Sequence, residues 1–388
     1  MKGKILTVTM VAGVVLALAS SANAQGGTAK PSTPRALFDV ACHAPSACMA
    51  VGPDSAEGEA GTYSVAVAVD GGKRWAIRFQ TPRMEPEPFI SCGSATSCTM
   101  AGNLAPSDRP ITYWTTDGGA SWHLTQVPIA TDILTGISCA TAKVCAITGI
   151  TGAPTAEQTE RVAITFDHGA KWVLHYLPMG LQVIVECASP SQCYLAGQHV
   201  TKGNAINNSS AVILRYRVYA SGWQLLRRSV LHGLDNVYGF GCNSATRCAG
   251  VGDHLTETSP TSGTDHFVSI ATTDSGTVWR RGKGPELFGD WTVSCPSRTI
   301  CVAGSAGDSS FPGALMIRST DGGLTWSEVN LGSAQPTASI MSAACASEQL
   351  CFAVGGQRAQ PPGEYAVSIL MSTDGGANWS TVRAAFLH

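Results

Sequence analysis

The sequence has 388 residues, a formal net charge of -2 and only 13% charged residues. Nucleic acid or an anionic membrane as the main partner would require a basic patch, so this composition argues against both. The 42 glycines and the scarcity of long helix-forming segments predict an all-β protein with many turns. A single β-sandwich would be oversized at this length, which favours a repeated architecture.

The chain begins with the pattern of a secretory signal peptide. Two lysines precede a mostly apolar segment from Ile5 to Ala19, and Ala22-Asn23-Ala24 has the small-x-small pattern of a cleavage site. We therefore predict a signal peptide over 1–24, a short linker over 25–36, and a mature protein that is secreted or periplasmic. No later segment approaches twenty consecutive apolar residues, so we expect no transmembrane segment.

The fourteen cysteines form seven pairs, each with five residues between the partners. They are Cys42 with Cys48, Cys92 with Cys98, Cys139 with Cys145, Cys187 with Cys193, Cys242 with Cys248, Cys295 with Cys301, and Cys345 with Cys351. Successive pairs are 47 to 55 residues apart, a period typical of one four-stranded propeller blade. We predict an all-β, seven-bladed β-propeller over 37–388, with approximate blades 37–86, 87–133, 134–181, 182–235, 236–289, 290–338 and 339–388.

Each blade is predicted to form four antiparallel strands, A to D. Strand A enters the first cysteine and strand B leaves the second, so the five-residue A–B turn places the two cysteines opposite each other, within disulfide reach. Export to an oxidising compartment favours one disulfide per blade. Zinc sites favour two to four residues between cysteines, so the metal alternative is weaker, and we expect no cofactor.

A second motif recurs with the same period, and we call it the Asp turn: an Asp, one or two glycines, and a Trp five residues after the Asp. Its copies begin and end at Asp70 and Trp75, Asp117 and Trp122, Asp167 and Trp172, Asp274 and Trp279, Asp321 and Trp326, and Asp374 and Trp379, and the fourth blade keeps only Trp223. The carboxylate can accept hydrogen bonds from turn amides, glycine allows positive φ, and the Trp can cover the hairpin base between blades. A motif present in six blades is structural rather than catalytic.

The Asp turn resembles the Asp box, or BNR repeat, of sialidases and of photosystem II assembly factor-like propellers, over about Leu37 to His388. The second group implies a non-enzymatic protein that binds a partner through one face. Sialidases usually carry an Arg-Ile/Val-Pro motif before the first box, and they use three arginines, a Tyr–Glu pair and an Asp. The segment before Asp70 offers only Pro34-Arg35-Ala36, so no catalytic residue is carried over.

The loops differ between the two faces of the predicted ring. The A–B turns always have five residues and the intact C–D turns share one spacing, whereas the B–C and D–A connections vary. We call the face with the B–C and D–A connections the loop face. Its longest inserts are Gln198 to Ser210 and Asp253 to His266. Variable loops on a rigid scaffold predict the ligand-binding face.

Three leads concern individual residues. Asp290 and Trp291 lie on a D–A connection, where an exposed Trp beside a carboxylate suits sugar stacking or a protein hot spot, and the alternative is a Trp that caps an inter-blade seam. Glu186 interrupts a row of small residues that precede the first cysteines; it either faces the central channel as a lone carboxylate or pairs with an Arg. The third lead is formed by Asp253, His254, Asp265 and His266, which could bind a metal ion together on one long loop. The alternative is a solvated flexible loop.

These observations favour a monomeric binding scaffold for a protein or a glycan. The alternative is a glycoside hydrolase of the sialidase-like kind, which needs two carboxylates roughly 5 to 10 Å apart in a cleft. The candidate loop-face acids are Glu87, Asp132, Glu186, Asp235, Glu286 and Asp290.

Overall fold

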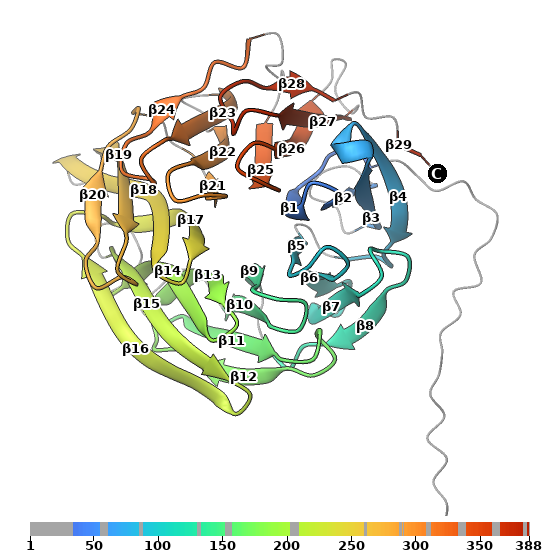
Figure 1. The fold of residues 1–388 in the computed structure, drawn as a ribbon. Coiled ribbons are helices and arrows are strands. Elements are labelled where there is room, and N and C mark those ends of the chain that lie inside the picture. The colour runs from blue at the N-terminus through green and yellow to red at the C-terminus, as the bar shows by residue number, and fades with distance from the viewer. Residues whose placement is uncertain are drawn as a thin grey trace, which may run out of the picture. The chain divides into compact units, whose positions relative to one another are not determined.

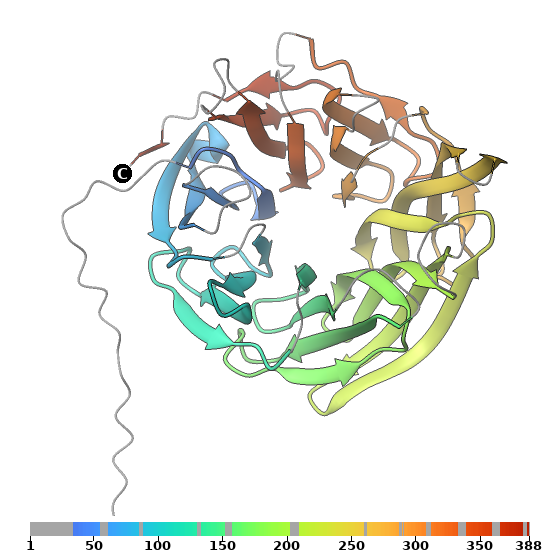
Figure 2. The same ribbon diagram turned by 180° about the vertical axis from the view of Figure 1, so that it is seen from behind.

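The computed structural model describes residues 34–54, 61–84, 88–129, 133–151, 157–201, 209–259, 262–286, 289, 291–307, 312–332, 339–358, 365–382 and 386–387. They belong to one unit, Pro31–His388, in which seven antiparallel sheets surround a central channel (Figures 1 and 2). The predicted seven-bladed propeller is confirmed. The predicted signal peptide lies outside the described residues, and no helix in the described part is long and apolar enough to cross a membrane.

The four strands of each blade follow chain order from the channel to the outer rim. Blades 1 to 3 consist of β1 (Asp39–Ala44), β2 (Ala47–Pro53), β3 (Tyr63–Val69), the 3-10 turn η1 (Asp70–Gly72) and β4 (Arg74–Gln80); β5 (Phe89–Cys92), β6 (Cys98–Leu104), β7 (Arg109–Thr115) and β8 (His123–Gln126); and β9 (Ile133–Cys139), β10 (Cys145–Thr151), β11 (Thr159–Thr165) and β12 (Val173–Tyr176).

Blades 4 and 5 have the longest strands. They consist of β13 (Leu181–Ser189), β14 (Gln192–Val200), β15 (Ser209–Tyr219) and β16 (Gly222–Leu231), and of β17 (Asn236–Ser244), β18 (Arg247–Ser259), β19 (Ser262–Thr272) and β20 (Arg280–Gly282). Blades 6 and 7 consist of β21 (Trp291–Ser294), β22 (Cys301–Gly307), β23 (Pro312–Ser319) and β24 (Ser327–Glu328), and of β25 (Ser339–Cys345), β26 (Cys351–Arg358), β27 (Tyr365–Ser372) and β28 (Ser380–Thr381).

The burial pattern explains why the strands differ in composition. The second strand of a blade, such as β10, is buried along almost its whole length because neighbouring blades cover both of its faces. The outer strands β8 and β12 are mostly exposed. Seven apolar clusters fill the seams between adjacent blades, and the Asp-turn tryptophans contribute to them. Trp75, for example, packs edge-on against Phe352 of blade 7, with ring centroids 5.6 Å apart.

Disulfides link the cysteines of every predicted pair, one in each blade, with Cα–Cα distances of 3.9 to 4.1 Å. The cysteines of a pair are direct cross-strand neighbours on strands A and B, as in Cys139 and Cys145. The prediction of one disulfide per blade is therefore confirmed.

In blade 2 the Asp turn is held by a compact set of hydrogen bonds. Asp117 Oδ1 accepts the Ser121 N–H at 2.9 Å and the Thr115 hydroxyl at 2.8 Å, and Thr115 Oγ1 accepts the Gly119 N–H at 3.0 Å. Hydrogen bonds, first of all from the Ser121 hydroxyl, lower the pKa of Asp117 to about 2. The same Thr/Ser-to-Asp bond occurs in blades 3, 5, 6 and 7. These carboxylates accept hydrogen bonds from groups of their own turns.

The four antiparallel strands of blade 1 all come from the N-terminal part of the chain, and the ring closes where blade 7 meets blade 1. Strand β25 contacts β1, and the Leu37 N–H donates to the Gly355 carbonyl at 3.1 Å. Near the C-terminus, β29 (Phe386–Leu387) adds a short parallel strand to the outer edge of β4 in blade 1. A main-chain contact and a two-residue strand therefore supplement the apolar seam between blades 7 and 1.

The insert over Asp253 to His266 differs from the prediction of a flexible loop. Strands β18 and β19 continue through it as a paired hairpin, with Asp253 opposite Phe267 and His254 opposite His266. Alternating Thr, His and Leu residues suit a cross-strand ladder, which composition alone did not reveal.

Candidate functional site

The central channel is a cavity of about 470 Å³ that touches the innermost strand of every blade. Its wall contains two carboxylates, Asp39 and Glu186, several hydroxyls and the rings of Phe89 and Tyr238. No Lys, Arg or His contributes to this wall among the described residues. The channel therefore offers hydrogen-bonding groups and negative charge, without a cation to hold an acidic ligand.

The tryptophans of the Asp turns lie away from this cavity, in the seams between blades. Each of four packs in a cluster with residues of the preceding blade, namely Trp172, Trp279, Trp326 and Trp379. Trp279, for example, contacts the ring of Tyr194 in blade 4, with centroids 6.5 Å apart. These rings are part of the apolar core, so none of them is a ligand-contact residue of the channel.

The common Asp-to-Trp spacing suggested that the Asp turns are identical. The same four tryptophans show that they differ. The Nε1–H groups of Trp326 and Trp379 donate to glycine carbonyls of their own turns, at 2.9 and 3.1 Å. The buried Nε1 atoms of Trp172 and Trp279 have no acceptor in the part of the chain that the structure describes. These two belong to the turns that carry one glycine instead of two, so the turn sequence and the indole hydrogen bond vary together.

The second cysteine of each pair belongs to the scaffold, whereas several first cysteines, such as Cys42, also line the channel. Cys48 on β2 and Cys193 on β14 are both 0% exposed, because the second strand of a blade is covered on both faces. Their disulfide partners on the innermost strands are Cys42 and Cys187. Cys48 and Cys193 therefore act through the disulfides alone and are out of reach of a ligand.

The innermost strands are sheet edges, so their outward N–H groups need acceptors. Side chains of the preceding blade supply several of them. The residue before the first cysteine accepts the N–H of the next blade's first cysteine: Ser91 from Cys139 at 2.9 Å, Ser138 from Cys187 at 2.9 Å, and Ser294 from Cys345 at 3.0 Å. The serines in the row of small residues thus form hydrogen bonds between blades.

Glu186 occupies the same position in blade 4 and follows the same rule. Its Oε1 accepts the Cys242 N–H at 3.4 Å, and its Oε2 accepts the Ser138 hydroxyl at 3.1 Å. Burial raises the pKa of Glu186 to about 7, against the two hydrogen bonds, which lower it. The carboxylate lines the channel, which was one of the two alternatives predicted for Glu186. Its hydrogen-bond partners are the Ser138 hydroxyl and the Cys242 main-chain amide, and not an arginine.

Asp39 bridges three blades at the start of β1. Its Oδ2 accepts the Ile90 N–H of blade 2 at 2.8 Å, and its Oδ1 accepts the Ser342 hydroxyl of blade 7 at 2.7 Å. Burial raises the pKa of Asp39 to about 6. Asp39 has no distinguishing feature in the sequence, because its role depends on contacts with Ser342, which is 303 positions away.

Asp39 and Glu186 line the same channel from different blades. They belong to blades 1 and 4, on different sides of the ring (Figure 1). Asp39 begins its strand near the loop face, whereas Glu186 precedes the disulfide near the opposite face. A third carboxylate, Glu160, is buried in the seam between blades 3 and 4 and accepts the Val183 N–H. Burial raises its pKa well above the usual value.

The loop-face end of the channel, which we call the channel mouth, is where the innermost strands begin. It carries one carboxylate, four hydroxyls and one phenyl ring, on Asp39, Phe89, Thr135, Tyr238, Thr292 and Ser342. The Tyr238 hydroxyl donates to Asp253 Oδ2 at 3.2 Å and thereby connects the mouth to the long hairpin of blade 5. Polar groups therefore surround the entrance from several blades.

Two histidine–carboxylate pairs flank this hairpin. His254 Nδ1 lies 3.1 Å from Asp235, and His266 Nδ1 lies 3.5 Å from Glu286. No group of three potential metal ligands occurs among the described residues. The Asp265 side chain, which belongs to the proposed four-residue metal group, lies outside the described part.

The remaining loop-face leads fall in different places. Trp291 is only 4% exposed and packs edge-on against Phe267, so it fills the seam between blades 5 and 6 instead of presenting an exposed ring for sugar stacking. The reason is that its apolar ring covers the inter-blade core beside β21. Asp290, Glu87 and Asp132 lie outside the described residues.

No protein-family model matches the sequence, and no curated protein is similar enough in sequence to count as a relative. The fold is similar to that of solved β-propellers. The GH74 xyloglucanase from Xanthomonas campestris has a TM-score of 0.57 and 10% identity, with 92% of this chain and 55% of that chain covered. This chain thus spans about half of that enzyme's length.

The β-propeller domain of the Trilobed protease from Pyrococcus furiosus has a TM-score of 0.51 and 9% identity, with 90% of this chain and 97% of that chain covered. A Trypanosoma rangeli sialidase reaches a TM-score of only 0.42, with 12% identity, over 63% of this chain and 47% of that chain. At these identities the likeness establishes a β-propeller fold and leaves the activity to be inferred from the site.

Proposed function

We propose that the propeller binds a neutral glycan at the channel mouth. The observation that carries this proposal is the chemistry of the channel mouth: hydroxyls, one carboxylate and aromatic rings, with no basic group among the described lining residues. The hydroxyls of Thr135, Tyr238 and Ser342 donate within the protein, so their oxygens remain as acceptors for sugar hydroxyls, and the apolar faces of sugars pack on rings such as Tyr238. A sialic acid would require cations for its carboxylate.

Binding to neutral and acidic oligosaccharides on a glycan array tests this proposal, followed by calorimetry with the best ligand. Tyr238→Ala removes a ring and a hydroxyl from the channel mouth, so we expect at least a tenfold loss of affinity, on the order of 1.4 kcal/mol. The matched control is Tyr176→Ala, which removes a tyrosine that is 66% exposed on the outer strand β12. Equal affinity in both variants, or selective binding of acidic glycans, would contradict the proposal.

Cleavage of a neutral glycan is the second candidate. It is favoured by the raised pKa values of two carboxylates in one channel, about 6 for Asp39 and about 7 for Glu186, because a glycosidase needs one protonated carboxyl group near neutral pH. Release of reducing ends from neutral polysaccharides, abolished by Asp39→Asn or Glu186→Gln, would establish hydrolysis. The inter-blade hydrogen bonds of both groups favour a structural role, so binding is the first candidate.

We also propose that the protein is exported and acts as a monomer outside the cytoplasm. Seven disulfides suit an oxidising compartment. The N-terminal sequence of the protein recovered from the culture medium or periplasm should begin at Gln25, and a mature protein that retains residues 1–24 would contradict the proposed processing.

A further inference from the structure

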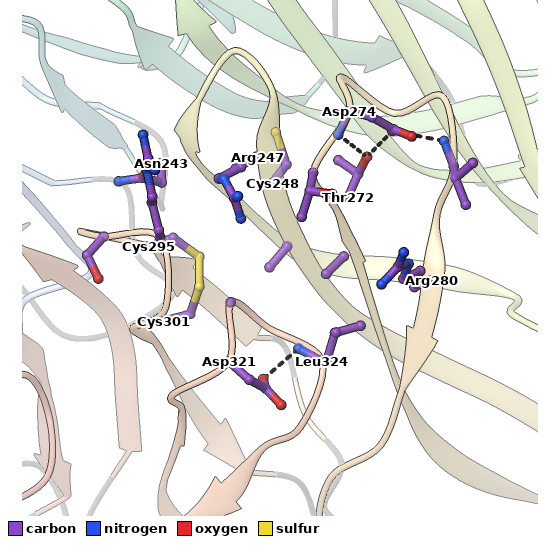
Figure 3. A pocket seen from close by; sticks show the side chains of 17 residues that line it. Asn243, Arg247, Cys248, Thr272, Asp274, Arg280, Cys295, Cys301, Asp321 and Leu324 are labelled. Carbon is purple, nitrogen blue, oxygen red and sulfur yellow. Dashed lines mark hydrogen bonds between the residues drawn. A yellow bond between two sulfur atoms is a disulfide. The ribbon is translucent and has the colours of Figure 1, made fainter.

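The face opposite the loop face has a hollow of about 130 Å³ between blades 5 and 6 (Figure 3). Arg247 at the start of β18, Arg280 at the start of β20 and Arg298 in the A–B turn of blade 6 all line it. In the described part of the chain none of the three guanidinium groups has a hydrogen bond or an ion pair. Three cations therefore surround one hollow without acceptors.

Two aspartates also line the hollow, and each accepts hydrogen bonds within its own turn. Asp274 Oδ1 accepts the Val278 N–H at 3.0 Å, and Asp321 Oδ1 accepts the Thr325 N–H at 2.9 Å. In Figure 3 both carboxylates lie by their own turns, while Arg247 and Arg280 stand on either side of the hollow. The aspartates belong to the repeated Asp turns and offset part of the positive charge, so three arginines against two aspartates leave a net charge of +1 at the hollow.

The other blades serve as internal controls for these positions. The position of Arg247 holds neutral residues in every other blade, namely Ala47, Ser97, Val144, Gln192, Ile300 and Leu350. The position of Arg298 holds no other cation, since its equivalents are Pro45, Ala95, Ala142, Pro190, Ala245 and Glu348. The residue after the Asp-turn Trp is Arg only at Arg280, its equivalents being Ala76, His123, Val173, Gln224, Ser327 and Ser380.

Scaffold residues recur from blade to blade, whereas these three arginines occur once and meet at one seam. Guanidinium groups that share a hollow repel one another, and an anion placed between them removes that repulsion. Each guanidinium presents a planar fork that matches two oxygens of an oxyanion. A carboxylate has only two oxygens, while a tetrahedral oxyanion has enough edges for three forks.

We propose that this hollow, lined by Arg247, Arg280 and Arg298, binds a tetrahedral oxyanion, a phosphate or sulfate group. The hollow is smaller than the roughly 300 Å³ of a site for a drug-sized ligand, so it accommodates the charged group while the rest of the ligand lies outside. The site is independent of the proposed neutral-glycan site, because it lies on the opposite face of the ring.

The test is calorimetric titration of the full mature protein with inorganic phosphate, inorganic sulfate and acetate at constant ionic strength. We expect phosphate and sulfate to bind, acetate to bind far more weakly, and Arg247→Gln or Arg298→Gln to weaken phosphate binding by about tenfold. The matched control, Arg217→Gln, removes an exposed arginine of β15 and should leave binding unchanged. Circular dichroism of each variant verifies folding.

Equal losses in Arg247→Gln and Arg217→Gln, acetate binding as tight as phosphate binding, or the absence of any heat from phosphate and sulfate would each overturn the proposal. Glucose 6-phosphate and N-acetylglucosamine 6-sulfate distinguish the source of the group. Tighter binding of the sugar esters assigns the site to a charged glycan, and tighter binding of the inorganic ions assigns it to free anions; both results support a site for tetrahedral oxyanions.

Discussion

Replacing Glu186 with glutamine should stabilise the propeller at alkaline pH and leave it unchanged at acidic pH. Glutamine has the same shape and keeps an oxygen for the Cys242 N–H. Burial raises the folded-state pKa of Glu186 from 4.5 to about 7. At about 1.4 kcal/mol per pKa unit, ionising this carboxyl group in the folded protein costs about 3 kcal/mol.

The sign follows from proton binding. Between pH 4.5 and about 7 the folded protein holds a proton on Glu186 that the unfolded chain has lost, so the free energy of unfolding falls as pH rises through this window. Below pH 4.5 both states are protonated, and the full stability is present. Asp39, with its pKa raised from 3.8 to about 6, contributes in the same direction.

Guanidinium unfolding with the disulfides intact, at pH 5 and at pH 8, measures the effect. Glu186→Gln should exceed the parent by no more than about 1 kcal/mol at pH 5 and by up to about 3 kcal/mol at pH 8. Glu328→Gln, at an exposed glutamate of β24, is the control and should change little at either pH. A similar change at both pH values, or a loss of stability at pH 8, would refute the assignment of Glu186 as a buried inter-blade acceptor.

Three further predictions concern the scaffold. His168→Gly and Ser275→Gly should each raise the free energy of unfolding by up to about 1 kcal/mol, because these residues have φ of 68° and 62° where other Asp turns have glycine; a loss in thermal-shift assays would show that the side chains matter more than the backbone. Replacing both Cys187 and Cys193 with alanine should lower the free energy of unfolding by about 2 kcal/mol, and an unchanged midpoint of chemical unfolding would contradict a stabilising role of this disulfide. Phe386→Ala should accelerate amide hydrogen exchange selectively in β4, and an equal acceleration in all strands would argue against a stabilising contact between β29 and β4.

The fold could be predicted because its determinants are local and repeated. Cys139 and Cys145 are joined by a five-residue turn, and Asp117 and Trp122 belong to one turn, so each motif reports on its own hairpin wherever it recurs. Seven recurrences define the number of blades.

The candidate sites could be predicted only in part, because they depend on contacts between blades. Glu186 was visible in the sequence as an exception in a repeated row of small residues. Its role as a hydrogen-bond acceptor could not be predicted, because it depends on where the Cys242 N–H lies in the folded ring. Asp39 gave no signal, since Ile90 and Ser342 reach it only after the ring closes. The arginine hollow could have been found by comparing equivalent positions across blades and looking for charges that occur once.

Hydrogen–deuterium exchange with the neutral oligosaccharide selected by the glycan array tests the proposed function most directly. If the sugar sits where the innermost strands begin, protection should appear in peptides that contain Asp39, Thr135 and Tyr238, and the outer strands and Asp turns should be unaffected. Protection confined to the Asp-turn face or the outer rim, or no protection with any neutral oligosaccharide, would contradict a glycan site at the channel mouth.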